Sequence, residues 1–79
     1  MVDRVLLKSV LASVLEVNAD QIDDESSMDT IGSWDSLRQM NLVLALEEAF
    51  AVSIPDDDAA NATSYKLLVL VLDEQLATA

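Results

Sequence analysis

The sequence of 79 residues contains no cysteine and no histidine. A chain without these residues cannot form a disulfide, a Ser-His-Asp triad, a cysteine nucleophile or an ordinary zinc site. The remaining side chains offer mainly carboxylates for chemistry. We therefore expect no catalytic residue and no metal site, and any reactive group that the protein uses should come from another molecule.

Glycine and proline each occur once, and aromatic residues make up only 4% of the chain, whereas apolar residues make up 52%. This composition disfavours a β-sandwich and favours helices packed around one small core. A chain of this length is near the lower size at which a single core suffices without disulfides. The composition therefore predicts an all-α fold in which residues 1–79 form one domain.

Basic residues are also scarce, since 4 Lys and Arg stand against 15 Asp and Glu and the formal net charge is −11. Nucleic acids and anionic membranes attract the opposite charge, so neither is an expected partner. Partner proteins with basic patches fit this charge, and salt should weaken their association. Alternatively, the acidity serves only solubility. The absence of a signal-peptide pattern and of a membrane-length apolar run favours a cytoplasmic protein without stable membrane insertion.

Apolar periodicity predicts three main helices and one short helix. The main helices span residues 2–16, 37–50 and 64–76, and the short helix spans residues 55–61, beginning at Pro55. Asp35 or Ser33 is the expected N-cap of the second helix, and Thr63 is that of the last helix. The aliphatic run 67–72 would also suit a strand, but nothing else in the chain offers it a strand partner.

Residues 17–33 form a connection that is long for so small a domain. Ile22, Met28 and Ile31 are expected to hold this loop on the core. Its acidic residues could bind a divalent cation only weakly, because their spacing relative to Gly32 does not match an EF-hand. A solvated acidic loop is the preferred interpretation. The acidic residues are Asp20, Asp23, Asp24, Glu25 and Asp29.

The predicted second helix carries two apolar faces. Leu42, Val43, Leu46 and Phe50 lie on one side of its helical wheel, and Leu37, Met40 and Leu44 lie nearly opposite, among Asn41, Glu47 and Glu48. If the first face is buried, the second is exposed, and an apolar patch rimmed by carboxylates is typical of a partner-binding surface. A larger assembly that buries both faces is the alternative.

The predicted last helix also has apolar residues on two sides. Its core face consists of Tyr65, Leu68, Val69, Leu72 and Leu76, and its outward residues are Leu67, Leu70 and Val71. A simple monomeric bundle does not explain the outward aliphatic residues. We expect a monomer, with these residues as a candidate contact for a weak homodimer.

Ser36 lies where the second helix should begin, directly after the acidic residue Asp35. A phosphate attached covalently to the Ser36 hydroxyl would lie at the positive end of the helix dipole, within reach of unpaired backbone N–H groups. An isolated serine at such a position would more often be only a first-turn or capping residue.

Three stretches together resemble the acyl carrier protein family. They are Asp35-Ser36-Leu37, the helical segment 45–50 and Ile54-Pro55-Asp56, and the similarity extends through nearly the whole chain. The resemblance implies a right-handed, acyl-carrier-like bundle of three main helices plus one short helix, with a long loop between the first and second helices. It also implies that Ser36 carries a 4′-phosphopantetheine arm, which a phosphopantetheinyl transferase moves from coenzyme A. Acyl groups would be held as a thioester on the arm's thiol, so the protein would be a carrier and not an enzyme.

The resemblance assigns partner recognition to the exposed face of the second helix. The implied partner-binding residues are Asp35, Leu37, Arg38, Met40, Asn41, Leu44, Glu47 and Glu48. The implied partners are the transferase, an acyl-loading ligase or transferase, and synthase-type enzymes with basic docking patches. By the same analogy, the carried chain would lie among the helices near Val43, Leu46, Ile54, Ala62 and Leu68.

Three residues near Ser36 depart from the pattern of this family. Arg38 and Asn41 stand where carriers of fatty-acid synthesis usually have acids, and Trp34 stands where a small residue is common. The last helix is also more aliphatic than usual. These departures favour a specialised discrete carrier in fatty-acid, polyketide or other specialised biosynthesis over the housekeeping carrier. The alternatives are a D-alanyl, aminoacyl or peptidyl carrier, and a non-catalytic helical adaptor with an unmodified serine.

Overall fold

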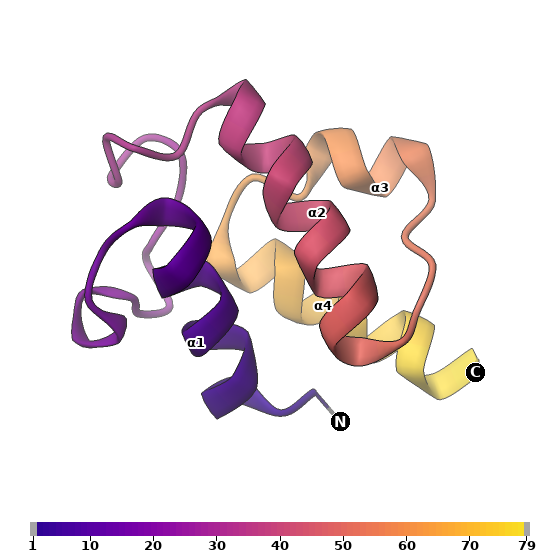
Figure 1. Ribbon diagram of the computed structural model, residues 1–79. Coiled ribbons are helices and arrows are strands. Elements are labelled where there is room, and N and C mark those ends of the chain that lie inside the picture. Colours follow the sequence, from indigo (N-terminus) through magenta and orange to yellow (C-terminus); the bar gives the residue numbers. More distant parts are fainter. Residues whose placement is uncertain (1, 79) are drawn as a thin grey trace.

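A computed structural model describes residues 2–78 of the chain. Its elements are α1 (Arg4–Leu15), the 3-10 helix η1 (Ala19–Gln21), α2 (Ser36–Phe50), α3 (Asp56–Asn61) and α4 (Tyr65–Thr78) (Figure 1). Within the described residues there is no β-strand, only a single antiparallel bridge between Ser27 and Ser64. The all-α prediction is confirmed, with three main helices, one short α-helix and a long loop between α1 and α2.

The three main helices begin at side-chain caps, whereas α3 begins after Pro55 without one. The Asp3 carboxylate accepts hydrogen bonds from the N–H groups of Val5 and Leu6 at the start of α1. The last helix was expected to be capped by Thr63, and this prediction is wrong by one residue. The Ser64 hydroxyl accepts the Leu67 N–H at 3.2 Å, which is the hydrogen bond of an N-cap.

The residues that follow α1 and α2 have a left-handed backbone conformation. Glu16 has φ 57° and Ala51 has φ 55°, and the N–H of each bonds back into the last turn of its helix. A residue with a Cβ is strained in this region, where glycine is the usual choice. The chain thus reverses sharply after each helix without using its one glycine there.

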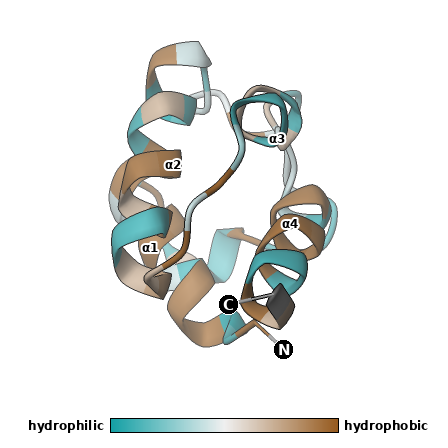
Figure 2. Ribbon diagram, turned by 90° about the vertical axis from the view of Figure 1, so that its right-hand side faces the viewer, coloured by the Kyte–Doolittle hydropathy of each residue, from teal (hydrophilic) through white to brown (hydrophobic). Residues whose placement is uncertain are grey.

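The hydrophobic core draws its largest side chains from three helices. The fully buried ones are Leu7, Leu11 and Leu15 of α1, Leu42 and Leu46 of α2, and Tyr65, Leu68 and Leu72 of α4. Hydrophobic residues predominate along α1 and α4, whereas the short helix α3 is largely hydrophilic (Figure 2). The three periodic core faces predicted from the sequence are therefore the ones that meet. None of the described helices has the length and apolar character needed to cross a membrane.

The outward face of α4 differs in part from the prediction. Leu67 and Leu70 are exposed as expected, at 41% and 64% of their surface. Val71 was also expected to point outward, but it is half-buried against the core. Val71 lies one turn after Leu68, so it flanks the buried face of the helix instead of opposing it.

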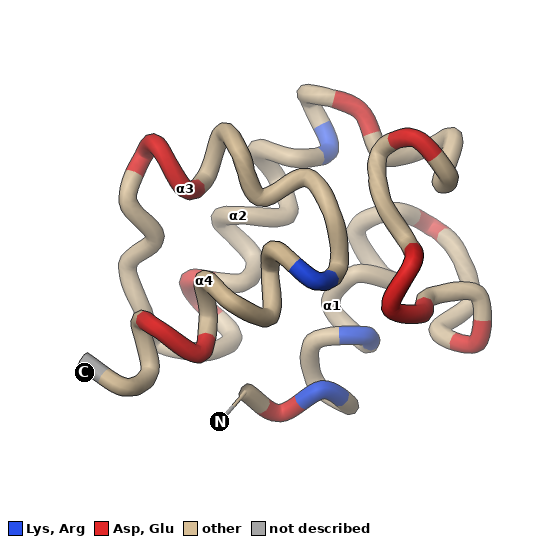
Figure 3. The backbone as a smooth tube through the Cα atoms, turned by 180° about the vertical axis from the view of Figure 1, so that it is seen from behind, with Lys and Arg blue, Asp and Glu red and all other residues tan. Residues whose placement is uncertain are grey.

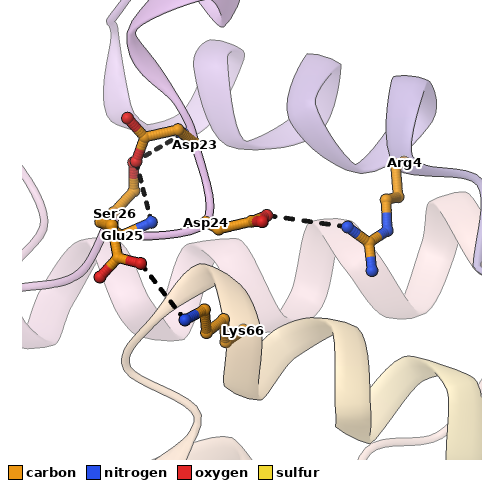
Figure 4. Close-up of polar contacts among 6 residues, drawn as sticks. All are labelled: Arg4, Asp23, Asp24, Glu25, Ser26 and Lys66. Carbon is orange, nitrogen blue, oxygen red and sulfur yellow. Dashed lines mark hydrogen bonds and ion pairs between the residues drawn. The ribbon is translucent and has the colours of Figure 1, made fainter.

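The loop between α1 and α2 is attached to both α1 and α4. Ile22 is buried and Met28 and Ile31 pack partly against the core, as predicted. The loop acids Asp24 and Glu25 pair with Arg4 of α1 at 3.7 Å and with Lys66 of α4 at 3.3 Å (Figure 4). Among the described residues, no group of three or more acidic, His or Cys side chains is arranged to hold a metal ion.

Candidate functional site

Ser36 is the first residue of α2, and its side chain is exposed. The carboxylate of Asp35 accepts the Arg38 N–H at 2.8 Å, so Asp35 is the N-cap, as predicted. The Asp35 carbonyl accepts the Gln39 N–H at 2.8 Å. The N–H groups of Ser36 and Leu37 have no acceptor among the described residues. They leave two donors at the positive end of α2 for an anion held on the Ser36 hydroxyl.

Two side chains hold the Ser36 turn against the end of α1. The Ser33 hydroxyl donates to the Leu15 carbonyl at 2.7 Å, so Ser33 is not a cap of α2. Arg38 donates through Nη1 to the Val14 carbonyl at 2.6 Å and through Nη2 to Glu16 at 3.2 Å. The bonds to Leu15 and Val14 satisfy carbonyls that the last turn of α1 leaves open. Arg38 is half-buried, and its guanidinium is directed at the end of α1.

Trp34 and Gln39 fix the same turn from the core side, and the sequence interpretation did not anticipate this. Trp34 is only 2% exposed, and its Nε1–H donates to Gln39 Oε1 at 2.7 Å. Gln39 is 5% exposed, and its Nε2 donates to the carbonyls of Ala59 at 2.8 Å and Ala62 at 3.0 Å. The sequence pattern does indicate the burial of Gln39, because residue 39 falls on the buried periodic face of α2, three residues before Leu42.

A groove with a volume of about 570 Å³ opens beside Ser36, between α2 and α3. It is lined by Met28, Ser36, Gln39, Met40, Val43, Leu44, Glu47, Ile54, Asp56, Ala59, Ala60 and Thr63. Apolar side chains form most of its wall. Of the residues expected near a carried chain, only Val43 and Ile54 line this groove. Leu46, Ala62 and Leu68 are fully or almost fully buried behind it.

The outer face of α2 is apolar and exposed, as predicted. Leu37, Met40 and Leu44, here called the α2 face, have 69%, 66% and 63% of their surface exposed. Asn41 and Glu48 are exposed beside them. Glu47 is half-buried, because its carboxylate accepts the Ile54 N–H at 2.8 Å. Three exposed apolar side chains on one helix face form a patch, which is less common than singly scattered apolar residues.

Acidic residues lie along the loop, at the start of α3 and in the second half of α4 (Figure 3). The basic residues of α1 and of the start of α4 lie next to the acidic loop, where Arg4 and Lys66 form ion pairs with it. The side that carries α3 is thus acidic. An approaching protein with basic groups would be attracted to it. A surface that combines an exposed apolar face with acidic side chains is typical of transient protein binding.

Comparisons with known proteins agree with this arrangement. Residues 5–72 match the family described as "Phosphopantetheine attachment site". An acyl carrier protein of Picosynechococcus sp. is 35% identical over 69 residues, which cover 87% of this chain and 85% of that protein. The solution NMR structure of holo acyl carrier protein from Geobacter metallireducens matches with a TM-score of 0.80 at 25% identity, covering 91% of this chain and 83% of that one.

The fold, the serine at the start of α2 and the family match define a protein with a phosphopantetheine attachment site. The chain belongs to the acyl carrier protein family. It is therefore a non-catalytic carrier with a covalent 4′-phosphopantetheine group. Its partners are a phosphopantetheinyl transferase and biosynthetic enzymes.

Proposed function

We propose that Ser36 is the residue that carries 4′-phosphopantetheine. The observation that supports this most directly is the exposed hydroxyl at the first position of α2, next to two N–H groups without an acceptor among the described residues. These N–H groups would hold an oxygen of the phosphodiester, and the helix dipole would stabilise its negative charge. When bound, the group supplies the thiol that this chain lacks, and acyl groups are carried on that thiol as thioesters.

In the loading reaction, the Ser36 hydroxyl oxygen attacks the phosphorus that bears the pantetheine arm in coenzyme A. A new P–O bond forms to serine, the phosphoanhydride P–O bond breaks, and 3′,5′-ADP leaves. The hydroxyl proton passes to a base of the transferase. The chain contributes position: Asp35, Ser33 and Arg38 fix the turn, so that Ser36 is presented in one orientation.

Intact mass spectrometry after incubation with coenzyme A and a broad-specificity transferase tests this proposal. We expect a mass gain of one phosphopantetheine group in the wild-type protein and in Ser33→Ala, and none in Ser36→Ala. Ser33 is a matched control because it lies three residues away and its hydroxyl is bonded to Leu15. An unmodified wild-type protein would instead support the helical adaptor, and an adduct on Ser36→Ala would assign the attachment to another residue.

We further propose that partner enzymes dock on the α2 face, together with Asp35, Asn41, Glu47 and Glu48. The support is the exposure of its three apolar side chains beside the Ser36 turn. Leu44→Asp should lower kcat/KM of the transferase about tenfold or more, because a buried leucine contributes this much to binding. Leu70→Asp is a matched control, since Leu70 of α4 is 64% exposed and Leu44 is 63% exposed. Equal losses in both variants would contradict docking on α2.

Charge should contribute to the same association. Partner affinity is expected to fall as ionic strength rises, because acidic residues of the carrier face basic patches of the enzyme. The measurement is the transferase KM over a salt series. A KM that does not change with salt would leave the apolar α2 face as the dominant contribution and would remove the electrostatic part of the proposal.

The carrier is proposed to serve a specialised pathway instead of housekeeping fatty-acid synthesis. Arg38 and Asn41 reduce the negative charge of the surface next to Ser36, and the structure directs Arg38 to α1. Mass analysis of the protein from its native host would identify the cargo. A ladder of saturated acyl chains would indicate the housekeeping role, whereas an aminoacyl or D-alanyl adduct would establish the alternative carrier class.

A further inference from the structure

Gln39 forms a buried polar bridge between the Ser36 turn and α3. Its carbonyl oxygen accepts from Trp34, and both hydrogens of its amide group are donated to backbone carbonyls, those of Ala59 and Ala62. We call Trp34, Gln39 and these two carbonyls the Gln39 bridge. Ala59 is in the last turn of α3 and Ala62 follows it, so their carbonyls lack helical partners. Gln39 thereby replaces the hydrogen bonds that would otherwise continue α3.

The Gln39 bridge lies at the inner wall of the groove beside Ser36. Gln39 and Ala59 both line the groove. The core residues Leu46, Ala62 and Leu68 are 0%, 2% and 1% exposed, and none of them lines the groove. The space between α2 and α3 is thus open to solvent on the outside and closed towards the core. The Gln39 side chain lies at the boundary between the open groove and the core.

This boundary discriminates between kinds of cargo. A short acyl group can lie in the open groove without moving α3. A long alkyl chain gains by leaving water completely, which requires it to pass between α2 and α3 towards the core. That passage separates Gln39 from the two carbonyls and leaves an amide and its acceptors unpaired in an apolar environment, which is costly.

We propose that Gln39 determines the cargo range of this carrier: it keeps the groove shallow, so that short acyl groups are held there and long alkyl chains stay in solvent. The proposal rests on attachment of the prosthetic group at Ser36. It assigns to Gln39 a role in specificity in addition to its structural one, because the two hydrogen bonds that join α2 to the end of α3 also close the inner end of the groove.

The test compares chain lengths on variants of the carrier. Wild type, Gln39→Leu and Gln21→Leu are loaded with butyryl- and dodecanoyl-phosphopantetheine from the corresponding coenzyme A thioesters, and intact mass confirms each product. Melting temperatures are then measured by circular dichroism. Gln21→Leu is the matched control, since it makes the same amide-to-alkyl change at an exposed residue of η1 that neither lines the groove nor belongs to the proposed docking surface. A purely structural role of Gln39 would shift both loaded forms of a variant equally.

We expect the two loaded forms of wild type, and those of Gln21→Leu, to melt at the same temperature. In Gln39→Leu, the dodecanoyl form should melt higher than the butyryl form by about 4–8 °C, as a modest gain in burial would produce in a domain of this size. A dodecanoyl form of wild type that is stabilised as much as that of Gln39→Leu would overturn the proposal. If no variant accepts the group on Ser36, the attachment proposal fails instead, and the intact masses distinguish the two failures.

A second measurement needs only the wild-type protein. An alkyl chain that stays in solvent should delay the dodecanoyl form on a hydrophobic-interaction column relative to the butyryl form. Equal retention of the two forms would show that the long chain is buried, and it would refute the role of Gln39 even if Gln39→Leu did not fold.

Discussion

Replacing Arg38 should weaken the contact between the Ser36 turn and α1. Its guanidinium donates to the Val14 carbonyl at 2.6 Å and to Glu16 at 3.2 Å. The first bond is charge-assisted and lies at the negative end of α1, where a cation is favoured. The second contributes little, because the Arg38 side chain is 31% exposed and that of Glu16 is 74% exposed. Together they predict that Arg38→Ala costs about 1–2 kcal/mol.

Arg38→Glu should be more destabilising than Arg38→Ala by about 0.5 kcal/mol, because it places a carboxylate beside Glu16 and the carbonyls that end α1. Because carriers of fatty-acid synthesis usually have an acid at this position, the same change should strengthen engagement by their enzymes. Any such gain would therefore come with a less stable carrier. The change in Tm should be roughly 4–8 °C for each kcal/mol in a domain of this size.

Urea unfolding followed by circular dichroism measures these differences, with Glu16→Gln and the double variant Arg38→Ala/Glu16→Gln completing a cycle. The coupling in the cycle should stay below about 1 kcal/mol, because most of the effect arises at Val14. Lys66→Ala is the control: its ion pair with Glu25 joins side chains that are 63% and 82% exposed, so its removal should change little. If Arg38→Ala and Lys66→Ala unfold at the same urea concentration, the assigned role of Arg38 is wrong.

Two further predictions test the left-handed end of α2 and the buried hydroxyl of Tyr65. Ala51→Gly should stabilise the protein by up to about 1 kcal/mol, because residue 51 is exposed and has a left-handed backbone conformation with φ 55°. The control Ala45→Gly, inside α2, should destabilise the protein by a similar amount. Both are measured by urea unfolding, and a loss of stability in Ala51→Gly would contradict the strain. Burial raises the pKa of the Tyr65 hydroxyl above 10.0, although Arg4 lowers it. The unfolded chain therefore loses this proton first and stability falls as the pH rises past about 10. Tyr65→Phe should weaken this fall, and at neutral pH it should not destabilise the protein, because the buried hydroxyl has no hydrogen-bond partner among the described residues. Identical pH profiles of the two proteins would refute the assignment.

The helices and the exposed α2 face were predictable because both follow from spacing along one segment. Leu42 and Leu46 recur with the helical period, and so do Met40 and Leu44 on the other side. The Asp35 cap was predictable for the same local reason, since its acceptor and the Arg38 N–H are three residues apart.

The contacts that the sequence did not reveal join segments that are distant in the chain. Gln39 and Ala62 are 23 residues apart, and Arg38 and Val14 are 24 residues apart. No periodicity links them, and Arg38 at the surface of a predicted helix gives no sign that it will turn towards another helix. The large aromatic side chain of Trp34 favours burial, but the sequence does not indicate the segment against which it packs.

Glu47 belongs to two structures at once. It is part of the surface next to the α2 face, and its carboxylate also accepts the Ile54 N–H at 2.8 Å, which holds the segment between α2 and α3 at the edge of the groove. A basic side chain of a docked enzyme that takes this carboxylate competes with Ile54 for it. Docking at Glu47 and the Glu47–Ile54 hydrogen bond are then thermodynamically linked. Docking weakens this hydrogen bond by the same free energy by which the hydrogen bond weakens docking.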